Sequence, residues 1–234
     1  MSVRAAAHEA PERQALVHGG GVLTWTELAE RADRVGASVE RRLESARHQV
    51  VAVVGGMGVE TVTAILALLD DRVPFVLLHP RWRRAERDRA LAMSGASLVI
   101  EDDGAVTTLP GAAAKESPLG SRAVVVFTSG STGRPRGAVL DHAALCASAE
   151  AHAGVFGWRE DDRWLLSLPT AHVSGLMIVV RSLLARRTIV LGGREAEGTF
   201  DAEGALRTIE RHRVTLLSVV PTMLGRLLDR GEGR

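Results

Sequence analysis

The feature that most constrains this fold is the alternation of short apolar runs with helical patterns along the chain. Val50 to Val54 is β-branched and continuously apolar, which is typical of a strand buried on both faces of a sheet. Two glycines follow it, and Met57 to Leu69 has the pattern of a helix. Further strands are expected at 74–78, 97–100, 123–128, 164–168, 188–191 and 214–220, and further helices at 83–93, 141–156, 174–185, 202–212 and 222–229. This repetition predicts βαβ units with mostly parallel strands, and therefore an α/β protein.

One segment, from Glu101 to Ser121, interrupts the alternation. It is rich in glycine, alanine, proline and acidic residues, so we interpret it as a surface loop. The loop divides the chain into two expected α/β lobes, residues 1–115 and residues 116–234. In each lobe we expect a mostly parallel sheet that is packed by helices.

Charge and cysteine content argue against several classes of protein. The 29 lysine and arginine residues nearly balance 28 aspartate and glutamate residues, so the net charge of +1 does not indicate a nucleic-acid or anionic-membrane binder. No apolar stretch approaches the roughly 18 residues that insert into and span a bilayer. The lone Cys146 fits a reducing compartment, and we expect a cytoplasmic protein. The histidines show no metal-ligand spacing, so no metal site is predicted.

The segment with the clearest chemistry is a loop of glycines and hydroxyl residues directly after the strand expected to end at Thr128. Glycines let successive backbone N–H groups approach one anion, hydroxyls add donors, and arginines add positive charge. The residues that we expect to hold a polyphosphate are Thr128, Ser129, Gly130, Ser131, Thr132, Gly133, Arg134, Arg136 and Gly137. A flexible linker is the alternative, but it does not explain the strand that enters the loop or the arginines on both sides of a proline. A Walker-type loop is excluded because arginine, rather than lysine and a hydroxyl residue, follows Gly133.

This loop resembles the phosphate-loop signature of the adenylate-forming (AMP-binding) superfamily, which includes the acyl-CoA synthetases. Relatives carry lysine where this chain has Arg134 and Arg136. Leu23 to Leu28 and Ala64 to Pro80 are similar to two other family segments in the same order, with His79 where relatives have asparagine. The resemblance implies that the chain is the front, incomplete part of the large domain of such an enzyme. It also implies ATP, Mg²⁺ and CoA as ligands, and activation of a carboxylic acid through an acyl-adenylate.

A second stretch, from Asp162 to Leu176, resembles one branch of the superfamily, the o-succinylbenzoate–CoA ligases of menaquinone biosynthesis. This resemblance implies an acid pocket formed by His172, Ser174, Gly175, Arg181, Ser218 and Thr222. It further implies that Arg181 lies near a free carboxylate of the substrate. The residues alone leave two alternatives open, a structural role for His172 and an internal aspartate or glutamate as the partner of Arg181.

The same resemblance assigns the family's catalytic lysine, and other residues that complete the reaction, to parts without a counterpart here. Lys115 is the only lysine and precedes the phosphate loop, so no catalytic residue is assigned. We expect a truncated ligase without the small C-terminal catalytic domain, with little or no adenylating activity alone. Unpaired strand edges and an exposed apolar face would favour self-association. A ligase for another aromatic or fatty acid, and a non-catalytic nucleotide-binding module, are the alternative functions.

Overall fold

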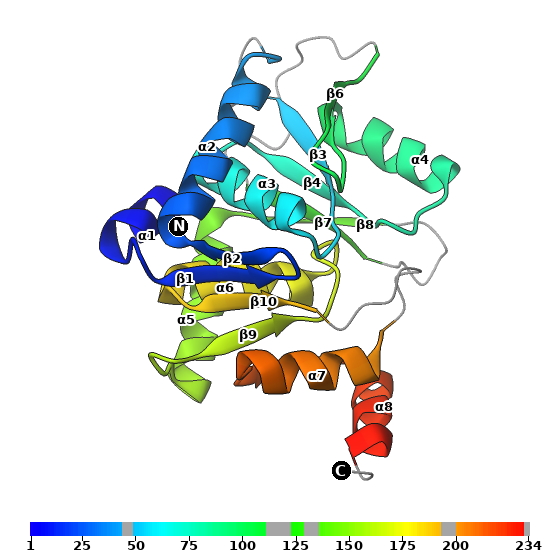
Figure 1. Ribbon diagram of the computed structural model, residues 1–234. Helices are drawn as coiled ribbons and strands as arrows, with labels where there is room; N and C mark the ends of the chain where they lie inside the picture. Colours follow the sequence, from blue (N-terminus) through cyan, green and yellow to red (C-terminus); the bar gives the residue numbers. More distant parts are fainter. Residues whose placement is uncertain (44–48, 111–122, 129–135, 193–199, 232–234) are drawn as a thin grey trace.

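The computed structural model describes residues 1–43, 49–110, 123–128, 136–192 and 200–231 (Figure 1). Within these ranges the chain is an α/β protein built on two sheets with helices on their faces, as the sequence predicts. None of the described helices has the length and apolarity needed to cross a membrane.

The first sheet, called sheet A, has the strand order β11-β9-β10-β1-β2. Its strands are β1 (Gln14–His18), β2 (Gly21–Thr24), β9 (Arg163–Leu166), β10 (Thr188–Leu191) and β11 (Leu216–Leu217). The neighbours β11, β9, β10 and β1 are parallel, and β2 returns antiparallel to β1 as a hairpin. Strands distant in sequence therefore meet, since Leu16 of β1 pairs with Ile189 of β10.

The second sheet, called sheet B, has the strand order β6-β5-β3-β4-β7-β8. Its strands are β3 (Val50–Val54), β4 (Phe75–Leu78), β5 (Ala96–Ile100), β6 (Val106–Thr108), β7 (Val124–Thr128) and β8 (Arg136–Leu140). The four central strands are parallel, and the edge strands β6 and β8 are antiparallel to their neighbours. The carboxyl ends of β3, β4, β5 and β7 consequently lie along one edge of the sheet.

The helices form layers on the two sheets. They are α1 (Val3–Glu9), α2 (Trp25–Glu40), α3 (Val59–Asp70), α4 (Arg84–Ser94), α5 (His142–Phe156), α6 (Val173–Ala185), α7 (Ala202–His212) and α8 (Pro221–Gly231). One core joins the inner faces of both sheets to α2, α3, α5 and α6. The outer face of sheet B packs on α4, and that of sheet A packs on α7 and α8. The result is a layered α-β-α-β-α arrangement (Figure 1).

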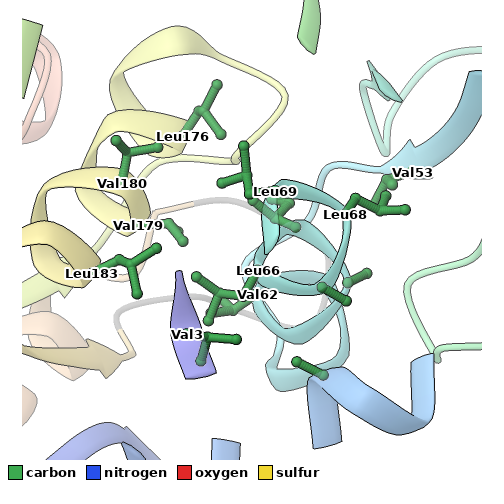
Figure 2. Close-up of a cluster of buried hydrophobic side chains, with 14 of the residues drawn as sticks. Val3, Val53, Val62, Leu66, Leu68, Leu69, Leu176, Val179, Val180 and Leu183 are labelled. Atoms are coloured by element: carbon green, nitrogen blue, oxygen red, sulfur yellow. The ribbon is translucent and has the colours of Figure 1, made fainter. Parts of the chain in front are cut away.

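The centre of the shared core lies between α3 and α6 (Figure 2). Leu66 and Leu69 of α3 face Val179 and Leu183 of α6, and all four side chains are at most 1% exposed. Both helices are apolar around most of their circumference, which is expected of helices enclosed between two sheets. This contact fixes α6, and with it the loop at its N-terminus, relative to sheet B.

Several details differ from what the sequence pattern predicts, and α1, β1, β2, α2 and β8 were not among the expected elements. The strand expected at 214–220 is limited to Leu216–Leu217, and β6 lies inside the expected surface loop 101–121. Each sheet also takes strands from both sides of residue 115, because β1 and β2 complete sheet A while β7 and β8 complete sheet B. The expected boundary between residues 1–115 and 116–234 therefore does not coincide with the division into sheets.

Candidate functional site

The carboxyl edge of sheet B carries a series of residues that can bind ligands. Gly55 and Gly56 follow β3, His79 follows β4, and Thr128 ends β7. Because Leu77 pairs with Val126, His79 and Thr128 lie at the same level on neighbouring strands, two residues further along each. The carboxyl ends of parallel strands are the usual place for ligands in α/β proteins. The candidate site therefore lies at this edge.

A loop from sheet A closes on this edge at the two glycines. The backbone N–H groups of Thr170 and Ala171 donate to the carbonyls of Gly56 and Gly55, each at 3.1 Å, and the Thr170 hydroxyl adds a third bond to Gly56 at 3.1 Å. A Cβ atom on Gly55 would lie 2.5 Å from the Ala171 nitrogen, so only glycine permits this approach. The contact sets the loop that leads into α6 against the end of β3.

The next residue of that loop, His172, meets His79 across the gap between the sheets. The two ring centroids are 5.0 Å apart, with an edge-on arrangement. Nδ1 of His79 accepts a hydrogen bond from the backbone N–H of Arg81 at 3.1 Å, which leaves Nε2 to carry the proton in the neutral ring. Partial burial lowers the pKa of His79, and the charges of His172 and Arg81 lower it further. His172 is more exposed, and partial desolvation and the charge of Arg81 lower its pKa as well. Both rings are thus kept neutral at pH 7, when they can donate or accept a hydrogen bond.

The phosphate loop of the sequence analysis joins β7 to β8. Residues 129–135 lie outside the described residues, which include only its ends at Thr128, Arg136 and Gly137. The Thr128 hydroxyl donates to the carbonyl of Arg136 at 3.2 Å, and Phe127 pairs with Gly137 across the hairpin. Both ends of the loop are therefore at the carboxyl edge of sheet B, with Thr128 on β7, the neighbour of the strand that His79 follows, and Arg136 on the edge strand β8.

A second group of candidate residues surrounds the indole of Trp164. The guanidinium carbon of Arg181 lies 5.6 Å from the ring centroid, in a cation–π arrangement. Nε1 of Trp164 donates to the Ser218 hydroxyl at 3.2 Å, and the Ser167 hydroxyl donates to the Ser218 carbonyl at 2.5 Å. Trp164 therefore joins Arg181 to Ser218, two residues that the family resemblance assigns to one pocket.

Arg181 is a partly buried cation without an anionic partner among the described residues. Its Nε is shielded from solvent and makes no hydrogen bond, and no described carboxylate lies within 4.0 Å of its guanidinium group. Burial lowers its pKa. An uncompensated charge in such a place is unfavourable, so the site is suited to an incoming anion.

The remaining predicted residues have different surroundings. Gly175 is buried, and a Cβ atom there would lie 2.3 Å from the Pro169 carbonyl oxygen, so its observed role is to let α6 pack on that backbone. Ser174 is exposed at the start of α6, and Thr222 is exposed near the start of α8. His172 and Arg181 are nine positions apart on one helix, which corresponds to about 13 Å along its axis. His172, the N-cap of α6, and Arg181 within the helix therefore lie at two separate places rather than at one point.

Several residues at this site had no assigned role in the sequence analysis. His79 was only a replacement for asparagine, and the two glycines after β3 were only the end of a strand. Their position at the carboxyl end of a parallel strand was a signal that could have identified them. For Trp164 the sequence held no such signal, because an aromatic residue in a strand is usually part of the core.

Comparisons of this chain with protein families, with curated sequences and with solved structures all indicate the same family. Residues 3–234 match the family of AMP-binding enzymes. The 2-succinylbenzoate–CoA ligase of Bacillus pumilus is 31% identical over an alignment of 245 positions, gaps included, that covers 97% of this chain and 49% of that protein. Two structures of o-succinylbenzoate CoA synthetase from Bacillus subtilis each align with 97% of this chain. The structure with the acyl-adenylate intermediate has a TM-score of 0.83 and 29% identity, and 63% of its own chain is covered. The structure with ATP and magnesium has a TM-score of 0.81 and 28% identity, and 65% of its own chain is covered. The chain spans about half the length of the curated relatives it matches.

Proposed function

This chain belongs to the family of AMP-binding enzymes, and from that premise we propose that it forms the nucleotide- and acid-binding part of a 2-succinylbenzoate–CoA ligase. The proposed reaction joins the acid to AMP, releases pyrophosphate, and then transfers the acyl group to the thiol of CoA. It belongs to menaquinone biosynthesis, and we propose that it takes place in the cytoplasm.

The observation that carries this proposal is the contact between His79 and His172, with ring centroids 5.0 Å apart. This contact brings the end of β4, beside the phosphate loop, against the start of α6, which leads to Arg181. An acid held near His172 would therefore have its reacting carboxylate next to the phosphates of ATP. Such positioning of two reactants is a large part of the catalytic effect in acyl and phosphoryl transfer.

At the nucleotide end, we propose that the loop from Thr128 to Gly137 holds the phosphates of ATP. Support comes from its ends, which lie at the carboxyl edge of sheet B. Backbone N–H groups, hydroxyls and the two arginines would stabilise the charge that develops on the departing pyrophosphate. Arginine would contact phosphate oxygens with two N–H groups at once, where the lysine of relatives offers a point charge.

At the acid end, we propose that Arg181 binds the second carboxylate of a dicarboxylic acid. 2-Succinylbenzoate carries two carboxylates and an aromatic ring, so one carboxylate remains free when the other reacts. The Arg181 side chain starts about 13 Å from His172 but leans toward the helix N-terminus, as helical side chains do, which shortens the span. Trp164 and Ser218 lie beside the guanidinium group and would form the wall of the pocket.

Magnesium accompanies ATP in one of the related structures, and we propose that this chain uses it in the same way. Among the described residues no group of three or more histidine, cysteine, aspartate or glutamate side chains is arranged to hold a metal ion. We therefore propose that magnesium enters with the phosphates of ATP rather than in a cage of protein side chains. CoA is proposed as the acyl acceptor, without assigned contacts.

Isothermal titration calorimetry with ATP tests the nucleotide part of the proposal. Replacing both Arg134 and Arg136 by alanine should weaken ATP binding about tenfold or more, because two charge-assisted contacts to phosphate are lost. The matched control replaces both by lysine, the pair found in relatives, and should bind ATP within a few-fold of the parent chain. AMP lacks the departing phosphates, so the alanine variant should lose much less affinity for AMP than for ATP. Equal ATP affinity of the alanine variant and the parent would contradict the proposal.

Pyrophosphate exchange tests the reaction itself. With ATP, labelled pyrophosphate and 2-succinylbenzoate, we expect at most weak exchange by this chain, since its only lysine, Lys115, precedes the phosphate loop. Strong exchange would show that the chain adenylates the acid without the lysine that relatives use. The acid-binding part is tested separately, by calorimetric titration with 2-succinylbenzoate.

A further inference from the structure

A third side chain contacts the indole that Arg181 covers. His152 of α5 stacks on Trp164 with ring centroids 5.2 Å apart and an angle of 33° between the planes. Its ring also lies 4.6 Å from that of Phe156 and 5.9 Å from that of Trp158. The imidazole is thus surrounded by aromatic faces, which offer it no hydrogen-bond acceptor of ordinary strength.

The polar atoms of this cluster are not satisfied within the described part of the chain. Nδ1 of His152 and Nε of Arg181 are both shielded from solvent, and neither has a hydrogen-bond partner there. Buried nitrogen atoms of this kind normally have partners, and leaving one without a partner costs about 1–3 kcal/mol. Arg181 Nε is a donor, and Nδ1 of His152 becomes one when it carries the proton, so an acceptor beside this indole would give a partner to both atoms.

We infer that His152 is a second contact, beside Arg181, for the remote carboxylate of the acid. This inference rests on the proposed function and extends it, since it assigns a specificity-determining role to a residue on a helix outside the pocket motifs. A carboxylate has two oxygens and can accept from a guanidinium group and an imidazole at once. An acid without a second carboxylate would leave both donors unpaired, so the pair would select dicarboxylic acids.

Proton binding gives this role a measurable signature. Burial lowers the pKa of His152, and the charge of Arg181 lowers it further. Of the other neighbours, Trp164 and Trp158 do not titrate, and Glu150 on the same helix is exposed. In the free protein the ring is therefore neutral at pH 7. A bound carboxylate offsets the charge of Arg181 and favours the imidazolium, so the pKa rises on binding. Binding then takes up protons at pH values between the lowered pKa of the free protein and the raised pKa of the complex, and the resulting gain in affinity is lost as the pH rises above the raised pKa.

Calorimetry in buffers of different ionisation enthalpy measures that uptake on the parent chain. His79 and His172 at the other end of the site also change their surroundings when the acid binds, so the readout is the difference between the parent and His152→Gln. We expect this variant to bind 2-succinylbenzoate about tenfold more weakly at pH 6.5 and with less proton uptake. His142→Gln, at the start of the same helix, is the matched control and should leave both quantities unchanged.

A second measurement follows the His152 Cε1 proton by NMR during a pH titration, with and without 2-succinylbenzoate. An upward shift of its pKa in the presence of the acid supports the inference without any variant. If the acid binds but this pKa stays constant and His152→Gln binds as well as the parent, the inference is wrong and the proposed function stands. If the parent binds no 2-succinylbenzoate, the proposed acid specificity fails, and the inference fails with it.

Discussion

Replacing Gly55 by alanine tests whether the close approach of β3 and the α6 loop holds the two halves of the site together. The added Cβ would lie 2.5 Å from the Ala171 nitrogen and 2.8 Å from its Cα, so backbone rather than a flexible side chain must move. Overpacking of this kind costs about 1–3 kcal/mol. Displacing the loop also breaks at least one of the three hydrogen bonds from Thr170 and Ala171, which is worth about 1 kcal/mol. The free energy of unfolding should fall by about 2–4 kcal/mol.

Urea denaturation followed by circular dichroism measures this loss. With a slope of about 2 kcal/mol per molar urea, the unfolding midpoint should fall by about 1–2 M. Gly154→Ala is the matched control, because Gly154 lies in α5 and a Cβ there meets nothing within 4 Å. That substitution should raise the free energy of unfolding by about 0.5–1 kcal/mol, since alanine favours a helix. A Gly55→Ala midpoint equal to that of the parent chain would refute the argument from close approach.

Three further predictions follow from the same structure. Because the pKa of both His79 and His172 is lowered in the fold, the unfolded chain binds more protons below about pH 6.5. The contribution of these two neutral histidines to the free energy of unfolding is therefore present above that pH and lost as the pH falls through their lowered pKa values. Urea midpoints taken at about pH 7.5 and 5.5 measure this loss, and His79→Asn should reduce it. Arg181→Leu should keep or raise the melting temperature while weakening binding of 2-succinylbenzoate at least tenfold, as calorimetry can show. Leu224→Glu with Leu228→Glu, at side chains 46% and 58% exposed on α8, should reduce self-association in sedimentation experiments if that apolar face causes it.

Local signals in the sequence were sufficient for many of the elements. Val50 to Val54 was expected to be buried on both faces, and all five residues are buried. Asp141 was a candidate N-cap, and its carboxylate accepts from the Ala144 N–H at 2.7 Å. The family-like segment from Leu23 to Leu28 contains a capping box, in which the side chains of Thr24 and Glu27 each accept from the other's backbone N–H. These features depend on neighbours in sequence, so the pattern alone identifies them.

Pairings between distant strands could not be predicted from the sequence pattern in the same way. The partner of β1 is β10, more than 170 positions away, and nothing in either short strand specifies the other. The expected strand 214–220 pairs with β9 only at Leu216 and Leu217, and the next carbonyl, that of Ser218, accepts from the Ser167 hydroxyl. The same limit applies to the contact between His79 and His172, which depends on how α6 packs between the sheets.

The use of arginine rather than lysine strengthens the argument for an anion at the far end of the site. A buried lysine can lose its proton and become neutral, so an unpaired lysine need not indicate a ligand. Arginine keeps its charge in proteins, so Arg181 must be compensated by its surroundings. The face of Trp164 supplies part of that compensation, and the described residues supply no carboxylate. A neighbour such as His152, neutral at pH 7, adds no charge of either sign to the free site. Around Trp164, the described residues therefore place the charge of Arg181 and an unpartnered imidazole nitrogen in an aromatic setting, which supports the proposal of an aryl acid with a second, unreacted carboxylate.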